Sequence, residues 1–306
     1  MHHKLARFAW FALIYTVVVI LWGAFVRATG SGAGCGAHWP LCDGMIIPRD
    51  PGTAMLIEFS HRVSSGLALI VVVILFVWVR RAVAPGLPAR RAAAAALVFI
   101  ITEALLGAVL VLFRLVAQDE SLARAMVMPL HLANTLVLLL CLTLTAHWLS
   151  GGAPVRLSGR TRVFGLAVAM LVLLIGVGKT GAVAALGDTL YPASSLSEGL
   201  RADISPAGSL LLRLRILHPA LALVTAVVLL FGLTALRVGD ADARGQLARR
   251  SVYVLTVVQV LFGFVNVWLL APVWAQLVHL LLADLLWIAL VLTAASALAE
   301  PVGTGQ

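Results

Sequence analysis

The chain has 306 residues, of which 62% are hydrophobic and 11% are charged, and its mean hydropathy is +1.05. Soluble globular domains carry about 25% charged residues, so this composition excludes a soluble protein. The net charge of +9 invites a nucleic-acid-binding interpretation, but the distribution of the basic residues gives it another origin.

Apolar runs of about 20 residues recur along the chain, and each is long enough to cross the roughly 30 Å hydrocarbon core of a bilayer. We therefore expect a multi-pass protein of the lipid bilayer with no soluble domain between its spans. The first run resembles a signal peptide only weakly, because it is long and no clear cleavage motif follows it. The expected spans are 7–26, 60–79, 92–113, 126–148, 162–180, 213–236, 248–270 and 274–297.

Basic residues concentrate in the N-terminus and in every second loop, which alternating spans place on one side of the membrane. The opposite loops carry most of the acidic residues. The positive-inside rule then predicts that both termini are cytoplasmic. Because the positive charge reports this topology, we expect no nucleic-acid partner.

The loop after the first span, GAGCGAHWPLCDG, contains Cys35 and Cys42. On the oxidising face of a membrane such a pair indicates a disulfide. The alternative is a metal site with His38, but the cysteine spacing is longer than in zinc sites and a fourth ligand is missing. Cys141 falls inside the fourth span, where we interpret it as an apolar filler.

Four histidines lie about two to six residues inside the outer ends of their spans, which is roughly 3–9 Å at the helical rise. A histidine in hydrocarbon is costly and is a functional candidate, and imidazole is a common ligand of haem iron. No C-x-x-C-H motif is present, so any haem is bound non-covalently. We expect two bis-histidine haem sites. The four residues are His61, His131, His218 and His279.

The chain divides into two halves of four spans, 1–150 and 151–306, at a loop rich in glycine, serine and arginine. Similar features recur in order in the two halves. We therefore expect an all-α integral membrane protein whose eight transmembrane helices form two parallel, pseudo-repeated four-helix bundles. The corresponding pairs are His61 and His218, offset by 157, Glu103 and Gln259, offset by 156, and His131 and His279, offset by 148.

The residue three positions before the first histidine distinguishes the halves. Glu58 shares a helix face with His61, whereas Arg215 takes the same position before His218. A carboxylate there can move a proton or stabilise a cation, and an arginine suits a haem propionate. The alternative for Glu58 is an interfacial side chain that snorkels to water and pairs with Arg62.

Two further acidic residues, Glu103 and Asp284, lie near the middle of their spans. Ionisable groups at that depth are functional candidates. The alternative is a protonated, hydrogen-bonded packing role, because a charge there is costly. Their roles stay open at this point.

The WPLC cysteine loop, the EFSHR opening of the second span and the single histidines that open spans four, six and eight resemble haem A synthase of the bacterial type. The resemblance covers essentially the full chain. It implies oxidation of a methyl group of haem O to the formyl group of haem A by successive hydroxylations, with Glu58 as the catalytic carboxylate.

The same resemblance implies that His61 and His131 flank the substrate haem in residues 1–150. It implies that His218 and His279 ligate a haem b in residues 151–306, which passes electrons. A bacterial plasma membrane location, haem O synthase as a partner and an electron donor are also implied. The donor's identity, homo-oligomerisation and a redox role of the cysteine pair stay open.

Three other functions compete with this interpretation. The first is a di-haem b protein that transfers electrons from quinol, the second a haem transporter or chaperone, and the third a structural bundle whose histidines only form hydrogen bonds. The difference between Glu58 and Arg215 favours an enzyme with two unlike haem sites.

Overall fold

The computed structural model describes residues 2–205, 209–239 and 242–299, and every regular element in these ranges is a helix. Eight helical segments are long and apolar enough to cross a membrane, which confirms the expected all-α membrane class. They are α1 (His2–Ala28), α2 (Thr53–Ala82), α3 (Pro88–Leu112), α4 (Leu122–Leu149), α5 (Thr161–Leu190), α7 (Leu210–Arg215) together with α8 (Leu217–Gly232), α9 (Ala243–Trp268) and α10 (Val273–Ala297).

Several helices extend beyond the apolar runs that predict them. Helix α2 begins at Thr53 rather than at 60, and α5 continues to Leu190 rather than ending at 180. An apolar run marks only the hydrocarbon-facing part of a helix, whereas backbone hydrogen bonds continue into polar sequence. His61 and His131 therefore lie about 12–14 Å along α2 and α4, deeper from the helix ends than expected.

The sixth span is broken at Ile216, between α7 and α8. Pro219 has no N–H to donate to the carbonyl four residues earlier, at Arg215, which explains an interruption at this position. His218 is the second residue of α8 and so lies directly after the break.

The segment 181–212, which lies between the expected fifth and sixth spans, is largely helical. It contains the end of α5, the short helix α6 (Leu196–Ile204) and the start of α7. The Ser195 hydroxyl caps α6 by accepting a hydrogen bond from the Glu198 amide. This Ser-x-x-Glu pattern is a known helix-start signal that was visible in the sequence.

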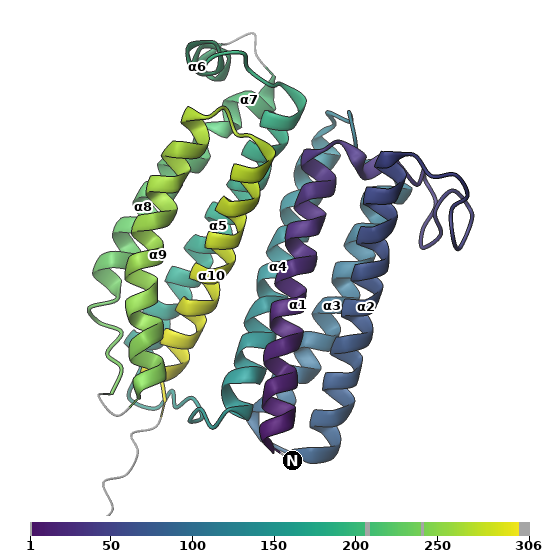
Figure 1. The fold of residues 1–306 in the computed structure, drawn as a ribbon. Coiled ribbons are helices and arrows are strands. Elements are labelled where there is room, and N and C mark those ends of the chain that lie inside the picture. Colours follow the sequence, from purple (N-terminus) through teal and green to yellow (C-terminus); the bar gives the residue numbers. More distant parts are fainter. Residues whose placement is uncertain (1, 206–208, 240–241, 300–306) are drawn as a thin grey trace, which may run out of the picture.

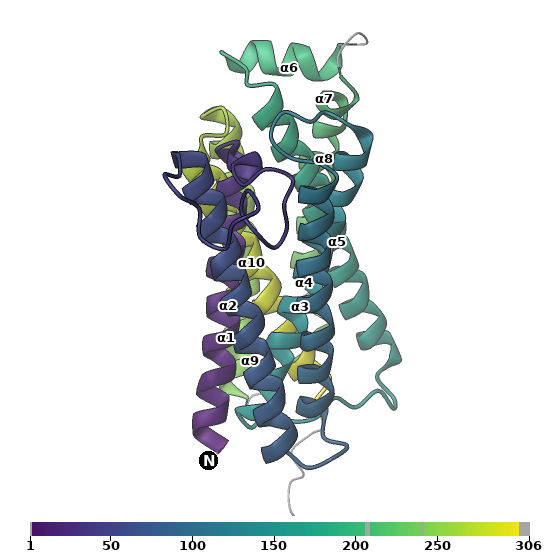
Figure 2. The same ribbon diagram turned by 90° about the vertical axis from the view of Figure 1, so that its right-hand side faces the viewer.

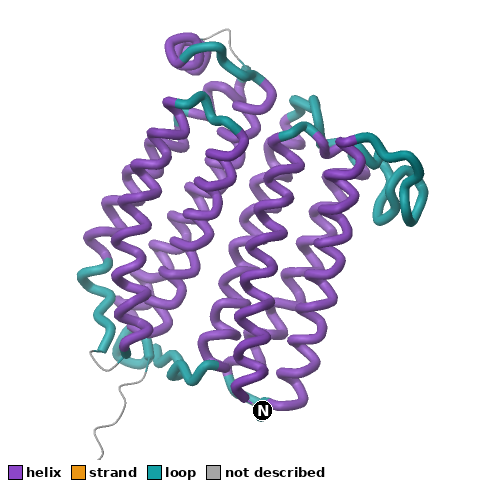
Figure 3. The backbone as a smooth tube through the Cα atoms, in the orientation of Figure 1, coloured by secondary structure: helices purple, strands orange, loops and turns teal. Residues whose placement is uncertain are grey.

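The spanning helices form two groups, α1–α4 and α5 with α8–α10, which stand side by side (Figure 1). Corresponding helices have corresponding neighbours: α1 packs on α2 and α4 as α5 packs on α8 and α10, and α3 packs on α4 as α9 packs on α10. The tube view shows that one end of these groups carries the long loop between α1 and α2 (Figure 3). The correspondence of neighbours is the arrangement that parallel repeats require, and the repeat itself stays a prediction.

The groups are joined rather than separate. Helix α4 contacts α5 and α10, and α1 contacts α10. Trp287 and Val291 of α10 belong to the hydrophobic core of α1–α4, while Leu286 and Leu290 belong to the core of the other group. The loop after α1 lies at the same end of the molecule as α6 and α7 (Figure 2). That end carries the side chains of the candidate site.

Candidate functional site

The histidines of the second half face each other. The His218 and His279 ring centroids are 6.2 Å apart, with perpendicular planes. Nδ1 of His218 lies 3.2 Å from the Val177 carbonyl oxygen, an acceptor, so Nδ1 carries the proton and Nε2 is free. Two imidazoles at this separation are close enough to ligate one haem iron, so His218 and His279 are the residues that would hold a haem in this half.

The histidines of the first half, His61 of α2 and His131 of α4, lie on two helices that both pack against α1. Nδ1 of His61 is buried without a hydrogen-bond partner among the described residues. Nδ1 of His131 lies 3.2 Å from a carboxylate oxygen of Glu103. Buried imidazole nitrogens of this kind suit a ligand that the protein atoms do not supply.

One glycine in each half makes room for the first histidine of that half. A Cβ atom added to Gly23 of α1 would lie 2.9 Å from Cε1 of His61, and one added to Gly181 of α5 would lie 2.9 Å from Cε1 of His218. No ordinary side chain fits at that distance. Both rings are therefore packed directly against a neighbouring helix backbone, and the donor set in both halves fits a bis-histidine haem.

Glu58 lies under the loop between α1 and α2, which is called the first outer loop after its predicted side of the membrane, and is only 3% exposed. Its Oε1 accepts hydrogen bonds from Arg62, at 3.2 Å from Nε and 2.5 Å from Nη2. Its Oε2 accepts one from the Cys35 amide at 2.8 Å. The expected alternative is thus right about the Arg62 pair and wrong about exposure, because Glu58 is buried rather than snorkelling to water.

The first outer loop is closed by a disulfide between Cys35 and Cys42, which confirms the expected pair and makes the metal alternative wrong. Arg62 fixes the loop to α2 by donating to the carbonyls of His38 and Leu41, each at 2.5 Å. Gly34 allows a close approach, since a Cβ there would lie 2.5 Å from the Ala54 backbone. The loop is therefore held directly against the start of α2.

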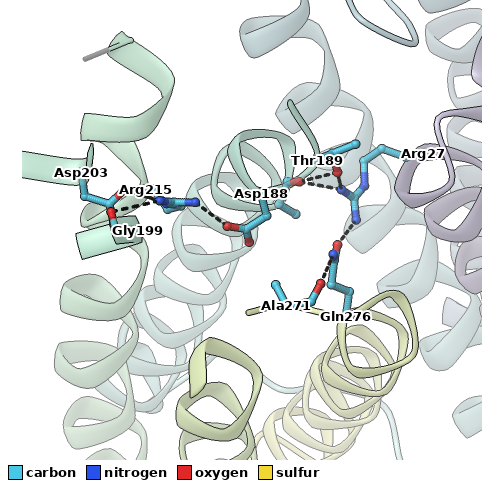
Figure 4. A network of polar contacts seen from close by, with 9 residues as sticks. Arg27, Asp188, Thr189, Gly199, Asp203, Arg215, Ala271 and Gln276 are labelled. Atoms are coloured by element: carbon cyan, nitrogen blue, oxygen red, sulfur yellow. Dashed lines mark hydrogen bonds and ion pairs between the residues drawn. The ribbon is translucent and has the colours of Figure 1, made fainter. Parts of the chain in front are cut away.

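Arg215 is engaged by two carboxylates (Figure 4). It donates to Asp188 at 2.7 Å and to Asp203 at 2.8 Å through Nε and 2.5 Å through Nη2. Asp203 belongs to α6 and Asp188 to α5, so this one side chain ties both helices to α7. The sequence indicated an arginine suited to a propionate but not these two acidic neighbours.

The family described as Cytochrome oxidase assembly protein (COX15-CtaA) matches residues 6–54 and 52–291 of this sequence. The chain belongs to this family. The resemblance drawn from the sequence motifs is thereby confirmed at the level of the family.

Named relatives of two kinds are similar to this member of the cytochrome oxidase assembly family. A "Protoheme IX farnesyltransferase" of Thermus thermophilus is 48% identical over 297 residues, which are 96% of this chain and 48% of that protein. A "Heme A synthase" of Alkalihalophilus pseudofirmus is 42% identical over 113 residues, 37% of this chain and 38% of that protein. One of Halalkalibacterium halodurans is 43% identical over 113 residues, with the same shares. The chain thus spans about half the length of the Thermus relative.

This family member also contains functional candidates that the sequence reasoning missed. Arg27 of α1 reaches across to the second half, where it donates to the Ala185 carbonyl and Thr189 hydroxyl of α5 and to Gln276 of α10 (Figure 4). The one signal in the sequence was an arginine at the end of a span, which is common. Its partners lie 158 to 249 residues away in the sequence, so no local spacing pattern predicts these contacts.

The two mid-span acids differ in their surroundings. Glu103 contacts three side chains of α4: His131, Asn134 and Thr135. Asp284 of α10 is completely buried, and neither of its carboxylate oxygens has a hydrogen-bond partner among the described residues. Of these two acids, it is therefore Glu103 that is connected to a candidate ligand.

Proposed function

We propose that this chain is a haem A synthase, an oxidoreductase that converts a methyl group of haem O to a formyl group by successive hydroxylations. The observation that carries the proposal is the presence of two partly buried histidine pairs with unlike charged neighbours, Glu58 and Arg215. Membership of the cytochrome oxidase assembly family and 42–43% identity to two proteins named Heme A synthase support it.

In this proposal residues 1–150 form the substrate half, where His61 and His131 hold the haem substrate. Glu58 acts at the methyl carbon being oxidised, either by taking a proton or by stabilising positive charge. Arg62 and the Cys35 amide orient its carboxylate. Such fixed polar groups need little rearrangement during the reaction, which is how they lower its barrier.

Residues 151–306 form the electron-transfer half, where His218 and His279 hold haem b. The bound haem b supplies electrons to the substrate half. The Val177 carbonyl keeps Nε2 of His218 available as a ligand. Arg215 is the proposed propionate partner, and it would share its guanidinium with Asp188 and Asp203.

The proposed setting is a bacterial plasma membrane with both termini in the cytoplasm. The basic loops support this orientation through the positive-inside rule. α1 begins and α10 ends at the same end of the molecule, as this topology requires (Figure 1). A haem O synthase is the proposed source of the substrate. The hydroxylations need an oxidant that supplies the oxygen atom, and with dioxygen in that role an electron donor is needed to reduce its second oxygen atom to water.

The test is to purify the protein, extract its haems and separate them by chromatography. The proposal expects haem b together with haem O or haem A. Haem b alone would support the di-haem electron-transfer function, and a colourless protein would support a structural bundle. Transit of unmodified haem between vesicles, without oxidation, would support a transporter.

A second candidate is prenyl transfer to haem, because the Thermus relative is named a farnesyltransferase. The match covers 48% of that relative, and its printed name describes the whole protein. Incubating the chain with haem b and farnesyl diphosphate tests this candidate. The haem A synthase proposal expects no prenylated haem under these conditions.

A further inference from the structure

Behind His131 lies a carboxylate that α4 holds in place. Oε1 of Glu103 lies 3.2 Å from Nδ1 of His131. Oε2 accepts a hydrogen bond from the Asn134 amide at 2.6 Å, and the Thr135 hydroxyl donates to Oε1. All three partners belong to the helix that carries His131. The Glu103 carboxylate is thus fixed against the edge of the imidazole ring that carries Nδ1.

The second half places a different group behind the corresponding histidine. Gln259 of α9 donates to the His279 carbonyl at 3.1 Å, and its amide nitrogen lies 3.4 Å from Nε2 of His279. Nδ1 of His279 is buried without a hydrogen-bond partner among the described residues. The first half therefore places a carboxylate at Nδ1 of its second histidine, whereas the second half places a neutral amide beside Nε2 and no hydrogen-bond partner at Nδ1 among the described residues.

This difference has a direct consequence for a metal-binding imidazole. A histidine that donates its second ring N–H to a carboxylate is fixed in one tautomer and becomes a more basic ligand. In the structure Nδ1 of His131 lies within ion-pair distance of the Glu103 carboxylate but forms no hydrogen bond with it, because the angle at the nitrogen is unfavourable. Such contacts commonly tighten when the ligand binds.

We propose that Glu103 is a positioning residue of the substrate site, which holds His131 with Nε2 toward the haem and increases electron donation from that imidazole. The inference rests on the proposed function, because it requires that His131 ligates a haem. It makes the two sites electronically unequal: the first-half haem has a carboxylate-backed ligand, and the second-half haem does not. A lower reduction potential at the first site follows.

A purely structural role is the competing possibility, in which Glu103 only ties α3 to α4 through Asn134. The two roles differ in their measurable effects. A residue that only connects α3 to α4 affects the stability of the protein, whereas a positioning residue also affects the reduction potential of the haem that His131 binds.

The experiment uses the full chain with His218→Ala, so that added haem b reports the first half. Its reduction potential is measured by spectroelectrochemistry with and without Glu103→Gln. The potential is expected to rise in the Gln variant while haem still binds, and haem affinity is expected to fall by about 10- to 100-fold at most. Glu120→Gln, which changes an exposed carboxylate paired with Tyr191, is the charge control.

Two further variants keep the inference falsifiable. Asn134→Ala removes one of the two side-chain hydrogen bonds from α4 to Glu103 and leaves the Thr135 bond and the Glu103–His131 contact, so it is expected to weaken the helix tie and leave the potential unchanged. Gln259→Glu in the otherwise native chain places a carboxylate beside His279 and is expected to lower the potential of the second-half haem, even if the first variant misfolds.

The inference is overturned if Glu103→Gln binds haem at an unchanged potential, or if Asn134→Ala shifts the potential equally. It is also overturned if Gln259→Glu leaves the second-half potential unmoved. Failure of the proposed function looks different: the His218→Ala protein would then bind no haem that depends on His61 and His131.

Discussion

Glu58 of α2 and Cys35 of the first outer loop are joined by a 2.8 Å hydrogen bond, in which the Cys35 amide donates to Oε2 of Glu58. The carboxylate proposed to act on the substrate is thereby attached to the loop that the disulfide closes. Its other oxygen is bound by Arg62, which also holds the loop carbonyls. The conformation of the loop and the position of the carboxylate are therefore set together.

Glu58→Gln is expected to reduce haem A formation by about 10²- to 10⁴-fold, the usual contribution of a group that acts in proton transfer. The amide keeps the size of the side chain, so both haems should remain bound. Chromatography of extracted haems should then show accumulated haem O or a hydroxylated intermediate. Normal haem A output from this variant would falsify the catalytic role.

Replacing both Cys35 and Cys42 with serine is expected to lower activity while leaving haem b in the second half. Opening a loop of this length costs about 2 kcal/mol of stability in the chain-entropy description, and the Cys35 amide then holds Glu58 less firmly. Haem content and haem A output of the purified variant check this. Cys141→Ala is the control, because this buried cysteine is free. An equal loss of both haems would contradict the expected confinement to the first half.

Valine in place of Gly23 is expected to remove haem from the first half, and valine in place of Gly181 from the second. Each new Cβ would lie 2.9 Å from a histidine ring atom, so the ring must move from its place. Absorbance spectra of the two purified variants should show the loss of different haems. Gly66→Val is the matched control on α2, since a Cβ there meets nothing within 4 Å. Identical spectra for the two variants would argue against two separate sites.

Arg215→Leu is expected to destabilise the outer end of the second half by about 3–5 kcal/mol, because it leaves Asp188 and Asp203 as unpaired, largely buried carboxylates. Thermal unfolding of the purified protein measures the loss. The triple variant that also carries Asp188→Asn and Asp203→Asn should recover part of it, because the uncompensated charges are gone. A single variant as stable as the parent would mean that the two acids find other partners.

The spans could be predicted from the sequence because apolar runs of membrane length seldom occur in proteins that do not cross a bilayer. The ends of the helices could not. The expected fifth span ends at 180, yet α5 continues to Leu190, and Arg215 and Arg27 bind the polar side chains of Asp188 and Thr189 in its last turn. These partners come from other helices, so no local pattern in α5 reveals them.

For the candidate site, the sequence indicated residues but not the contacts between them. The four histidines and the cysteine pair stood out because buried imidazole and outer-face thiols are rare and chemically distinctive. The Glu103–His131 contact did not, because it depends on how α3 and α4 are rotated about their axes, and 28 residues of sequence separation do not fix that rotation. The same holds for the ring of His218 and its acceptor on α5, the Val177 carbonyl.

The contacts of Arg27 bear on the rate of electron transfer between the two halves rather than on haem binding. Its side chain extends from α1 and donates three hydrogen bonds to α5 and α10. Helix α1 therefore cannot tilt or slide against the second half without breaking these bonds. The proposed electron path crosses this junction. A rigid junction keeps the distance between the two proposed haem sites constant. The rate of electron transfer between them would then depend on the arrival of substrate and reductant and not on slow relative motion of the two halves.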